Sequence, residues 1–426
     1  MNGRLSTRWV WLALVAVLAA TNAAMAQTRT VTFMHWGGES YVARYERLIA
    51  DFEMRNPGIK IERIGGGSGQ EYDDTLLTRI AGGVAPDVYI VDMQYVARYA
   101  PMVHDLRPLA ERDPDFKLDE LAPVIIDVFT ADGKLIAFPH DVSPNLYFYN
   151  ADMFEEAGLE LPTLTWRRDA WTWATFRDAA RKLHRTDADR RVTVWGTLAG
   201  TGQSLPRLFM WSNGAAEFDD VLKPTKALHD HPDAIEALDF LQQLHIADGV
   251  AVPVGQNASF PAGEVAMFAR WSSGIAAFAA APFKWGLAPY PKGPGPNGRY
   301  ASDIGTAGFV IHETAADVEA AWKFVSYLAG PHAAVIIGEM GPGIPVRPGA
   351  EITNFPENLL YPEAVYEIAA LPDKGNHIRL LSKDQADINN ILTEEIDKIL
   401  AGAVPAASGA SELVRRVATF LANNPQ

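Results

Sequence analysis

The sequence predicts an α/β protein, and three of its features indicate that it folds into more than one lobe. Short apolar strands alternate with amphipathic helices between Thr30 and Asp92, which is typical of a parallel sheet covered on both faces. After Asp92 this regular alternation stops, and the later strands and helices follow one another in a different pattern. The 426 residues also exceed the usual size of one domain, about 150 residues, so two or three domains are expected.

The first 26 residues have the composition of an export signal. Arg4 and Arg8 give a positive start, and the 12 residues from Trp9 to Ala20 are all apolar. This run is shorter than the roughly 20 apolar residues that a membrane-spanning helix needs. Ala24-Met25-Ala26 places small residues where a signal peptidase cleaves, so we expect cleavage before Gln27. A buried N-terminal helix is the alternative interpretation.

The charge and the lack of cysteine restrict the partners of the exported chain. Without Arg4 and Arg8 the chain keeps 35 basic and 52 acidic residues, a net charge of −17. This balance disfavours nucleic acid and anionic membranes as partners. The absence of cysteine excludes disulfides, thiol catalysis, cysteine-bound zinc and a lipid-modified cysteine anchor. We therefore expect a soluble periplasmic protein.

The N-terminal part of the mature chain shows the alternating pattern most clearly. Residues 30–34, 59–64 and 88–91 are predicted strands. A helix capped by Ser40 should run to Asn56-Pro57-Gly58, which ends it. A second helix, with Tyr72, Leu76, Leu77 and Ile80 on one face, should follow the glycine run 65–69.

The later elements are separated by three long segments rich in proline or glycine. Further strands are predicted at 134–138, 146–149, 192–196, 265–268, 285–288 and 307–311, and helices at 173–183, 234–247, 316–328 and 387–400. Segments 139–145, 289–298 and 341–349 are too long or too rich in proline and glycine for tight turns. We expect these three passages to connect two α/β lobes.

Short motifs spread along the mature chain point to one family. They are Val31–Trp36, Asn56–Ile59, Ala85–Val88, Gly133–Pro139, Leu146–Phe154 running to Ala157–Leu159, Phe260–Met267 and Gly305–Ile311. In this order and spacing they resemble family 1 of the extracellular solute-binding proteins. The resemblance implies a type II periplasmic binding protein fold, in which two discontinuous α/β domains close on a ligand about a hinge. It places residues 27–142 and 301–345 in the N-terminal lobe, and residues 143–300 and 346–426 in the C-terminal lobe.

The resemblance also implies a function and partners. We expect a monomer that binds a sugar or sugar-like polar molecule for an ABC importer and then docks on its transmembrane permease. No cofactor and no catalytic residue are expected. The open alternatives are the same fold with a glycerophosphodiester, polyamine or peptide as cargo, a sensor subunit, and a secreted glycoside hydrolase using Glu39 and Asp141.

Candidate ligand-binding residues follow the ends of the predicted strands, because ligands bind beyond the carboxyl ends of such strands. A sugar needs amides or carboxylates for its hydroxyls and aromatic rings for its apolar faces. Trp36 and Asp92 fit this pattern, although a core tryptophan and a helix cap explain them as well. Glu39 binds a hydroxyl or stabilises a helix N-terminus. Ser68 lies in the glycine run, which lacks a nucleotide-binding motif.

The predicted loop 139–145 and four later segments supply the remaining candidates. Asp141 is expected to face the cleft, with Ser143 and Asn145 beside it, because a buried carboxylate needs polar partners that a ligand supplies. The later candidates pair aromatic or charged side chains with small polar ones. They are Trp211, Trp271, Ser272, Gly305, Thr306 and Arg347. Core packing of the two tryptophans and a structural salt bridge of Arg347 are the alternatives.

Metal and hydrolase motifs are weak or missing. His229-Asp230-His231 has no third ligand at a recognisable spacing and is better explained as a solvated turn before Pro232. Neither Gly-x-Ser-x-Gly nor His-Glu-x-x-His occurs. The sequence therefore favours binding over catalysis.

Overall fold

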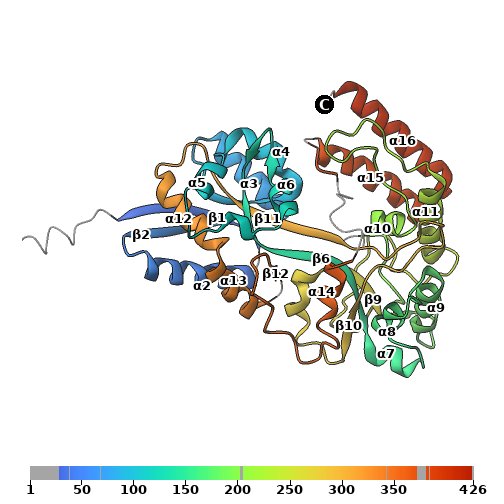
Figure 1. Cartoon of the computed structure of the whole chain (residues 1–426). Helices are drawn as coiled ribbons and strands as arrows, with labels where there is room; N and C mark the ends of the chain where they lie inside the picture. Colours follow the sequence, from blue (N-terminus) through green and yellow to red (C-terminus); the bar gives the residue numbers. More distant parts are fainter. Residues whose placement is uncertain are drawn as a thin grey trace, which may run out of the picture.

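The structure is a computed structural model, and it describes residues 28–37, 39–67, 69–201, 205–341, 343–371, 380–382 and 384–424. The predicted export signal and Ser68 lie outside the described residues. The chain forms two lobes that lie side by side and are joined by long strands (Figure 1). Each lobe has its own cluster of buried apolar side chains.

The first lobe contains the predicted alternation of strands and helices, which is confirmed. β1 (Arg29–His35) pairs in parallel with β2 (Ile59–Gly65) and β3 (Val88–Asp92). The connecting helices are α2 (Glu39–Arg55) and α3 (Gln70–Ala81). The other elements around this core are η1 (Met93–Tyr95), α4 (Val96–Tyr99), η2 (Ala100–Met102), α5 (Arg107–Glu111), η3 (Leu118–Glu120), α6 (Pro123–Val128), β4 (Thr130–Ala131), β5 (Lys134–Leu135), α12 (Val318–Leu328) and α13 (Pro331–Met340).

The second lobe packs mainly helices around two antiparallel strands. β9 (Met267–Trp271) and β10 (Trp285–Ala288) both pair with the end of a long shared strand, β6. The remaining elements of this lobe are α7 (Ala151–Glu156), α8 (Pro162–Arg167), α9 (Trp173–Leu183), β7 (Arg185–Thr186), β8 (Val192–Val194), α10 (Pro206–Ser212), α11 (Pro232–His245), η4 (Ser272–Phe278), α14 (Ala364–Ala369), α15 (Gln385–Leu400) and α16 (Ala406–Asn423).

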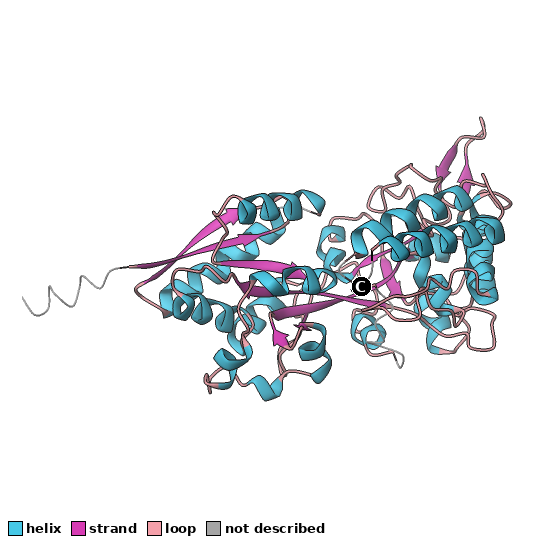
Figure 2. Cartoon of the chain, turned by 90° about the horizontal axis from the view of Figure 1, so that it is seen from above, coloured by secondary structure: helices cyan, strands magenta, loops and turns pink. Residues whose placement is uncertain are grey.

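The predicted loop 139–145 was wrong, because these residues belong to one strand. β6 runs without interruption from Phe138 to Asn150 and reaches from the first lobe into the second (Figure 2). Pro144 is tolerated because β12 pairs with β6 only at 141–142 and β9 only from Asn145 onwards. On the edge of β6 where β12 and β9 lie, no strand is therefore paired at Pro144. The backbone N–H that proline lacks is not needed there for a bond between strands.

Three segments pass between the lobes. β6 is the first, and β11 (Asp303–Ile311) is the second, which pairs with both β6 and β3. The third contains β12 (Ile344–Pro345), which pairs with β6 at Val142 and Asp141. The segment 289–298, predicted as a crossing, instead packs on the second lobe, where Gly293 and Arg299 donate to the carbonyl of Ser212. Because all three crossings pair side by side, the hinge is a strip of sheet.

Candidate functional site

Seven of the predicted binding residues meet where β9, β6 and β11 run side by side between the lobes. They are Asp141, Ser143, Asn145, Trp271, Ser272, Gly305 and Thr306. In the strand register Ser143 lies opposite Gly305, and Asn145 lies opposite Trp271. Residues far apart in the sequence are thus brought together on neighbouring strands, and we call this region the junction.

The indole ring of Trp271 packs closely on β11 because a glycine, Gly305, faces it. A Cβ atom placed on Gly305 would lie 2.9 Å from the indole ring of Trp271. The tryptophan is only partly buried, so part of the ring faces the surface of the junction. This combination of a fixed position and an exposed face suits an aromatic platform for the apolar side of a sugar ring.

The small polar residues of the junction are largely occupied by protein partners. Ser143 Oγ lies 3.0 Å from Ser272 Oγ and accepts a bond from the Ser273 N–H at 2.9 Å. The amide oxygen of Asn145, which is fully buried, accepts from the Tyr290 hydroxyl at 2.9 Å. These bonds fasten the start of η4 to β6, so Ser143 and Asn145 hold the backbone around Trp271 in place.

Asp141 is the centre of a buried polar cluster that connects the three crossings. Its carboxylate accepts from Arg44 at 3.2 Å and lies 3.1 Å from His140 Nδ1. Its carbonyl accepts from the Thr306 hydroxyl on the second crossing. Arg44 also donates to the carbonyl of Gly341, which precedes the third crossing. Asp141 is therefore engaged by protein groups at both its carboxylate and its carbonyl, and its side chain keeps 16% exposure.

The charge state of Asp141 follows from these contacts. Burial alone would raise the pKa of its carboxyl group. The charges and hydrogen bonds of His140 and Arg44 outweigh burial, so the pKa lies below the ordinary value. The carboxylate is thus stabilised in its ionised form by the protein itself.

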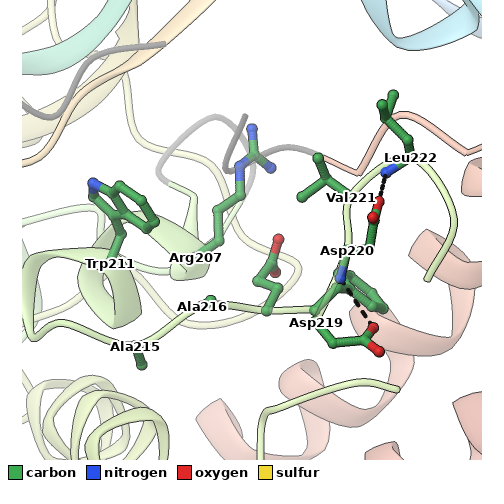
Figure 3. Close-up of a pocket in the computed structure, with 10 residues that line it drawn as sticks. Arg207, Trp211, Ala215, Ala216, Asp219, Asp220, Val221 and Leu222 are labelled. Carbon is green, nitrogen blue, oxygen red and sulfur yellow. Dashed lines mark hydrogen bonds between the residues drawn. The ribbon is translucent and has the colours of Figure 1, made fainter. Parts of the chain in front are cut away.

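A pocket of about 420 Å³ opens in the second lobe beside Trp211. Arg207 and Trp211, one helical turn apart on α10, line it together with the loop that carries Asp219 to Leu222 (Figure 3). Arg207 donates to Asp303 at 2.7 Å, at the start of β11. The guanidinium of Arg299 lies 5.0 Å from the centre of a Trp211 ring. Trp211 also lines a smaller pocket with six other residues: Tyr300, Ser302, Ile304, Ile368, Ala369 and Leu371.

The predicted residues of the first lobe lie at the ends of its strands. Trp36 directly follows β1 and packs edge-on against Tyr72, with ring centres 5.2 Å apart. Asp92 ends β3 and accepts from the Gln94 N–H at 3.0 Å, so it does cap a helical turn. Glu39 is the first residue of α2, but its side chain lies outside the description.

Arg347 follows the third crossing; its side chain packs against the first lobe and is only 2% exposed. It donates to the carbonyls of Ala329 at 2.7 Å and Lys117 at 2.9 Å, and its guanidinium lies over the ring of Phe116. The side chain is thus tied to first-lobe backbone, and neither the junction nor the pocket beside Trp211 contains it.

Sequence reasoning missed several charged or aromatic residues at the site. Arg207 was missed although its helical spacing from Trp211 was readable. Arg44 and Tyr41 were missed because nothing local shows that α2 packs against β6 and η4. Arg270 was missed although it directly precedes Trp271.

The described residues provide no recognisable metal site. His231 caps α11, and its ring accepts from the Asp233 N–H. His229 is fully buried, 3.5 Å from Glu217, rather than part of a solvated turn. Within the described part of the chain, no helix is long and apolar enough to cross a membrane.

Comparison with known proteins gives consistent matches. A profile described as bacterial extracellular solute-binding protein matches residues 38–335. The Listeria monocytogenes ABC substrate-binding protein in complex with cycloalternan superposes with a TM-score of 0.81 at 25% identity, covering 93% of this chain and 100% of that one.

Two curated relatives match over shorter stretches. The mannitol-binding protein of Pseudomonas aeruginosa is 25% identical over 187 residues, 42% of this chain and 40% of that protein. The sn-glycerol-3-phosphate-binding periplasmic protein of Salmonella typhimurium is 30% identical over 191 residues, 42% of each chain. The match thus spans about two-fifths of the length of these relatives.

Proposed function

This chain belongs to the family of bacterial extracellular solute-binding proteins, and we propose that it is the periplasmic substrate-binding component of an ABC importer for a sugar or sugar-like molecule. The fold is that of the type II periplasmic binding proteins, as the resemblance predicted. The proposed lobes consist of residues 27–142 with 301–345, and 143–300 with 346–426.

The observation that carries the proposal is the aromatic and polar surface at the junction of the lobes. Trp271 rests on Gly305, and Trp211 lines a small pocket with Tyr300, Ser302 and Ile304 around the start of the same strand. A pyranose or polyol presents apolar C–H faces between hydroxyl edges, which matches such a surface. Trp36 and Asp92 would supply the opposing side from the first lobe, and Glu39 and Ser68 are further candidates there.

The ligands named for the matched proteins share this chemistry. Mannitol, cycloalternan and sn-glycerol 3-phosphate all carry several hydroxyl groups. Asp141 would act on the ligand indirectly, since its carboxylate is occupied by Arg44 and His140. A glycosidase would need a second carboxylate at a defined distance from Asp141 and free to act, and no described contact supports such a pair.

Hinge closure is the proposed mechanism. Ligand contacts from both lobes would be complete only in the closed form, so the ligand shifts the population by its differential affinity. The closed protein would then dock on the transmembrane permease, and no reaction would be catalysed.

A thermal-shift screen tests the function. The purified protein is tested against neutral monosaccharides, disaccharides and polyols, and against their carboxylated and phosphorylated counterparts, at saturating concentration. A ligand at 100 times its dissociation constant should stabilise the protein by about 2.7 kcal/mol. Trp271→Ala and Trp211→Ala should abolish the shift. Trp195→Ala is the control, because Trp195 is equally half-buried in the second lobe but packs on His184. A folded protein that responds to no compound, or that converts one, contradicts the proposal.

A further inference from the structure

Arg270 is an arginine at the junction for which the described residues provide no ion pair. It precedes Trp271 at the end of β9, and its guanidinium lies 5.4 Å from the ring centre of Phe278. Gly274 leaves room for it, since a Cβ there would collide with the guanidinium. Its Nε is buried and has no hydrogen-bond partner among the described groups. Burial lowers the pKa of Arg270, and the Tyr41 hydroxyl is the one group that opposes this.

Other arginines around the junction are engaged. Arg44 is paired with Asp141, and Arg207 is paired with Asp303. The nearby carboxylates, Asp141 and Asp303, are therefore already occupied by other cations. A partly buried guanidinium without an anion is costly, because it has lost part of its hydration without compensation.

Arg270 faces the boundary between the lobes. Tyr41, which packs on the first core, is close enough to interact with both Arg270 and the side chain of Ser273 in η4. An anionic group bound here would contact Arg270 from the second lobe and the Tyr41 hydroxyl from the first. Such contacts exist together only when the lobes approach, so they would favour closure.

We infer that the ligand is a polyhydroxylated anion whose acid group is held by Arg270, with the adjacent sugar face on Trp271. This inference rests on the proposed function and specifies its substrate class. The planar guanidinium suits a carboxylate or a phosphate, because both accept two parallel N–H bonds. The acid group is therefore either a sugar carboxylate or a phosphate ester, which the experiment distinguishes.

Titration calorimetry with matched neutral and acidic probes tests the inference. The pairs are D-glucose with D-glucuronate, D-galactose with D-galacturonate, and glycerol with sn-glycerol 3-phosphate. At least one acidic probe should bind about tenfold or more tightly than its neutral partner, as expected for a charge-assisted bond. The pair that shows this preference identifies the acid as a carboxylate or a phosphate.

Variants assign the preference to Arg270. Arg270→Gln should abolish it, so that the acidic probe binds no more tightly than its neutral partner. Arg270→Lys keeps the positive charge but loses the two parallel N–H donors of the guanidinium, so it should retain only part of the preference for the acid. Arg191→Gln is the control, since Arg191 is exposed on the hairpin after β7 and should change nothing. If Arg270→Gln does not fold, Arg270→Lys and Tyr41→Phe replace it as tests. Both variants should weaken binding of the acidic probe.

The outcomes separate this inference from the proposed function. If neutral sugars bind as tightly as acids, or the preference survives Arg270→Gln, the inference is wrong and sugar binding stands. If no neutral or acidic probe binds to the folded protein, the proposed function falls as well.

Discussion

Replacing Asp141 by alanine should destabilise the protein through Arg44 rather than through loss of a ligand contact. Arg44 is only 4% exposed, and its one described carboxylate partner is Asp141. Removing that partner leaves a buried, uncompensated cation, which typically costs about 3–5 kcal/mol. Arg44 keeps its bond to the Gly341 carbonyl and its position over the Tyr41 ring, so we expect the lower end, about 3 kcal/mol.

Urea unfolding followed by tryptophan fluorescence measures this loss. In a double-mutant cycle with Arg44→Met, the double variant should lose at least about 1.5 kcal/mol less unfolding free energy than the two single variants together. The reason is that no unpaired charge remains in the double variant. The cost of Asp141→Ala should also fall at low pH. The pKa of Asp141 is lowered in the folded protein, so its contribution is present above the unfolded value, about 3.9, and is lost as the pH falls through the folded value. Additive single changes, or a cost below about 1 kcal/mol at pH 7, would refute the role of this pair.

Three further predictions concern the two lobes. Burial, aided by the charge of Asp92, raises the pKa of Asp73 to about 6. Asp73→Asn should thus have the same stability as the wild type below about pH 4 and be more stable by about 3 kcal/mol at pH 8. Thermal unfolding at the two pH values measures this difference, and the same stability difference at both would exclude the raised pKa. Gly305→Ala should push Trp271 from its position and weaken ligand binding about tenfold in calorimetry, with stability changed by under about 2 kcal/mol; unchanged affinity would exclude the platform. Trp211→Leu should lower the free energy of unfolding only slightly but remove most of the ligand affinity. If stability and affinity fall together, Trp211 has a purely structural role.

The parallel half of the first lobe could be predicted because its signals are local. Buried residues Val88 to Val91 form a run, and Asn56-Pro57-Gly58 ends a helix whatever surrounds it. The continuity of β6 through residues 139–145 could not be predicted, because its two prolines act locally as strand breakers. They are tolerated only through the arrangement of β9 and β12, which is a tertiary property.

The site shows the same division between local and long-range information. Trp36 and Trp271 could be named as candidates because each lies at a predicted strand end beside small residues. The partners of Asp141 could not be inferred, since Arg44 lies 97 residues earlier in the chain. Arg270 could not be selected from the sequence either. It stands out because the described residues provide it with no ion-pair partner, and a sequence does not show which charged side chains lack one.

The most direct test of the central claim measures the distance between the lobes with and without ligand. The chain has no cysteine, so Thr78→Cys on α3 and Ser411→Cys on α16, both exposed, accept spin labels without further changes. Thr78→Cys with Lys323→Cys is the control pair within the first lobe. Saturating ligand from the screen should shorten the distance between the lobes and leave the control distance unchanged. A bound ligand that changes neither distance would contradict closure of two lobes around it.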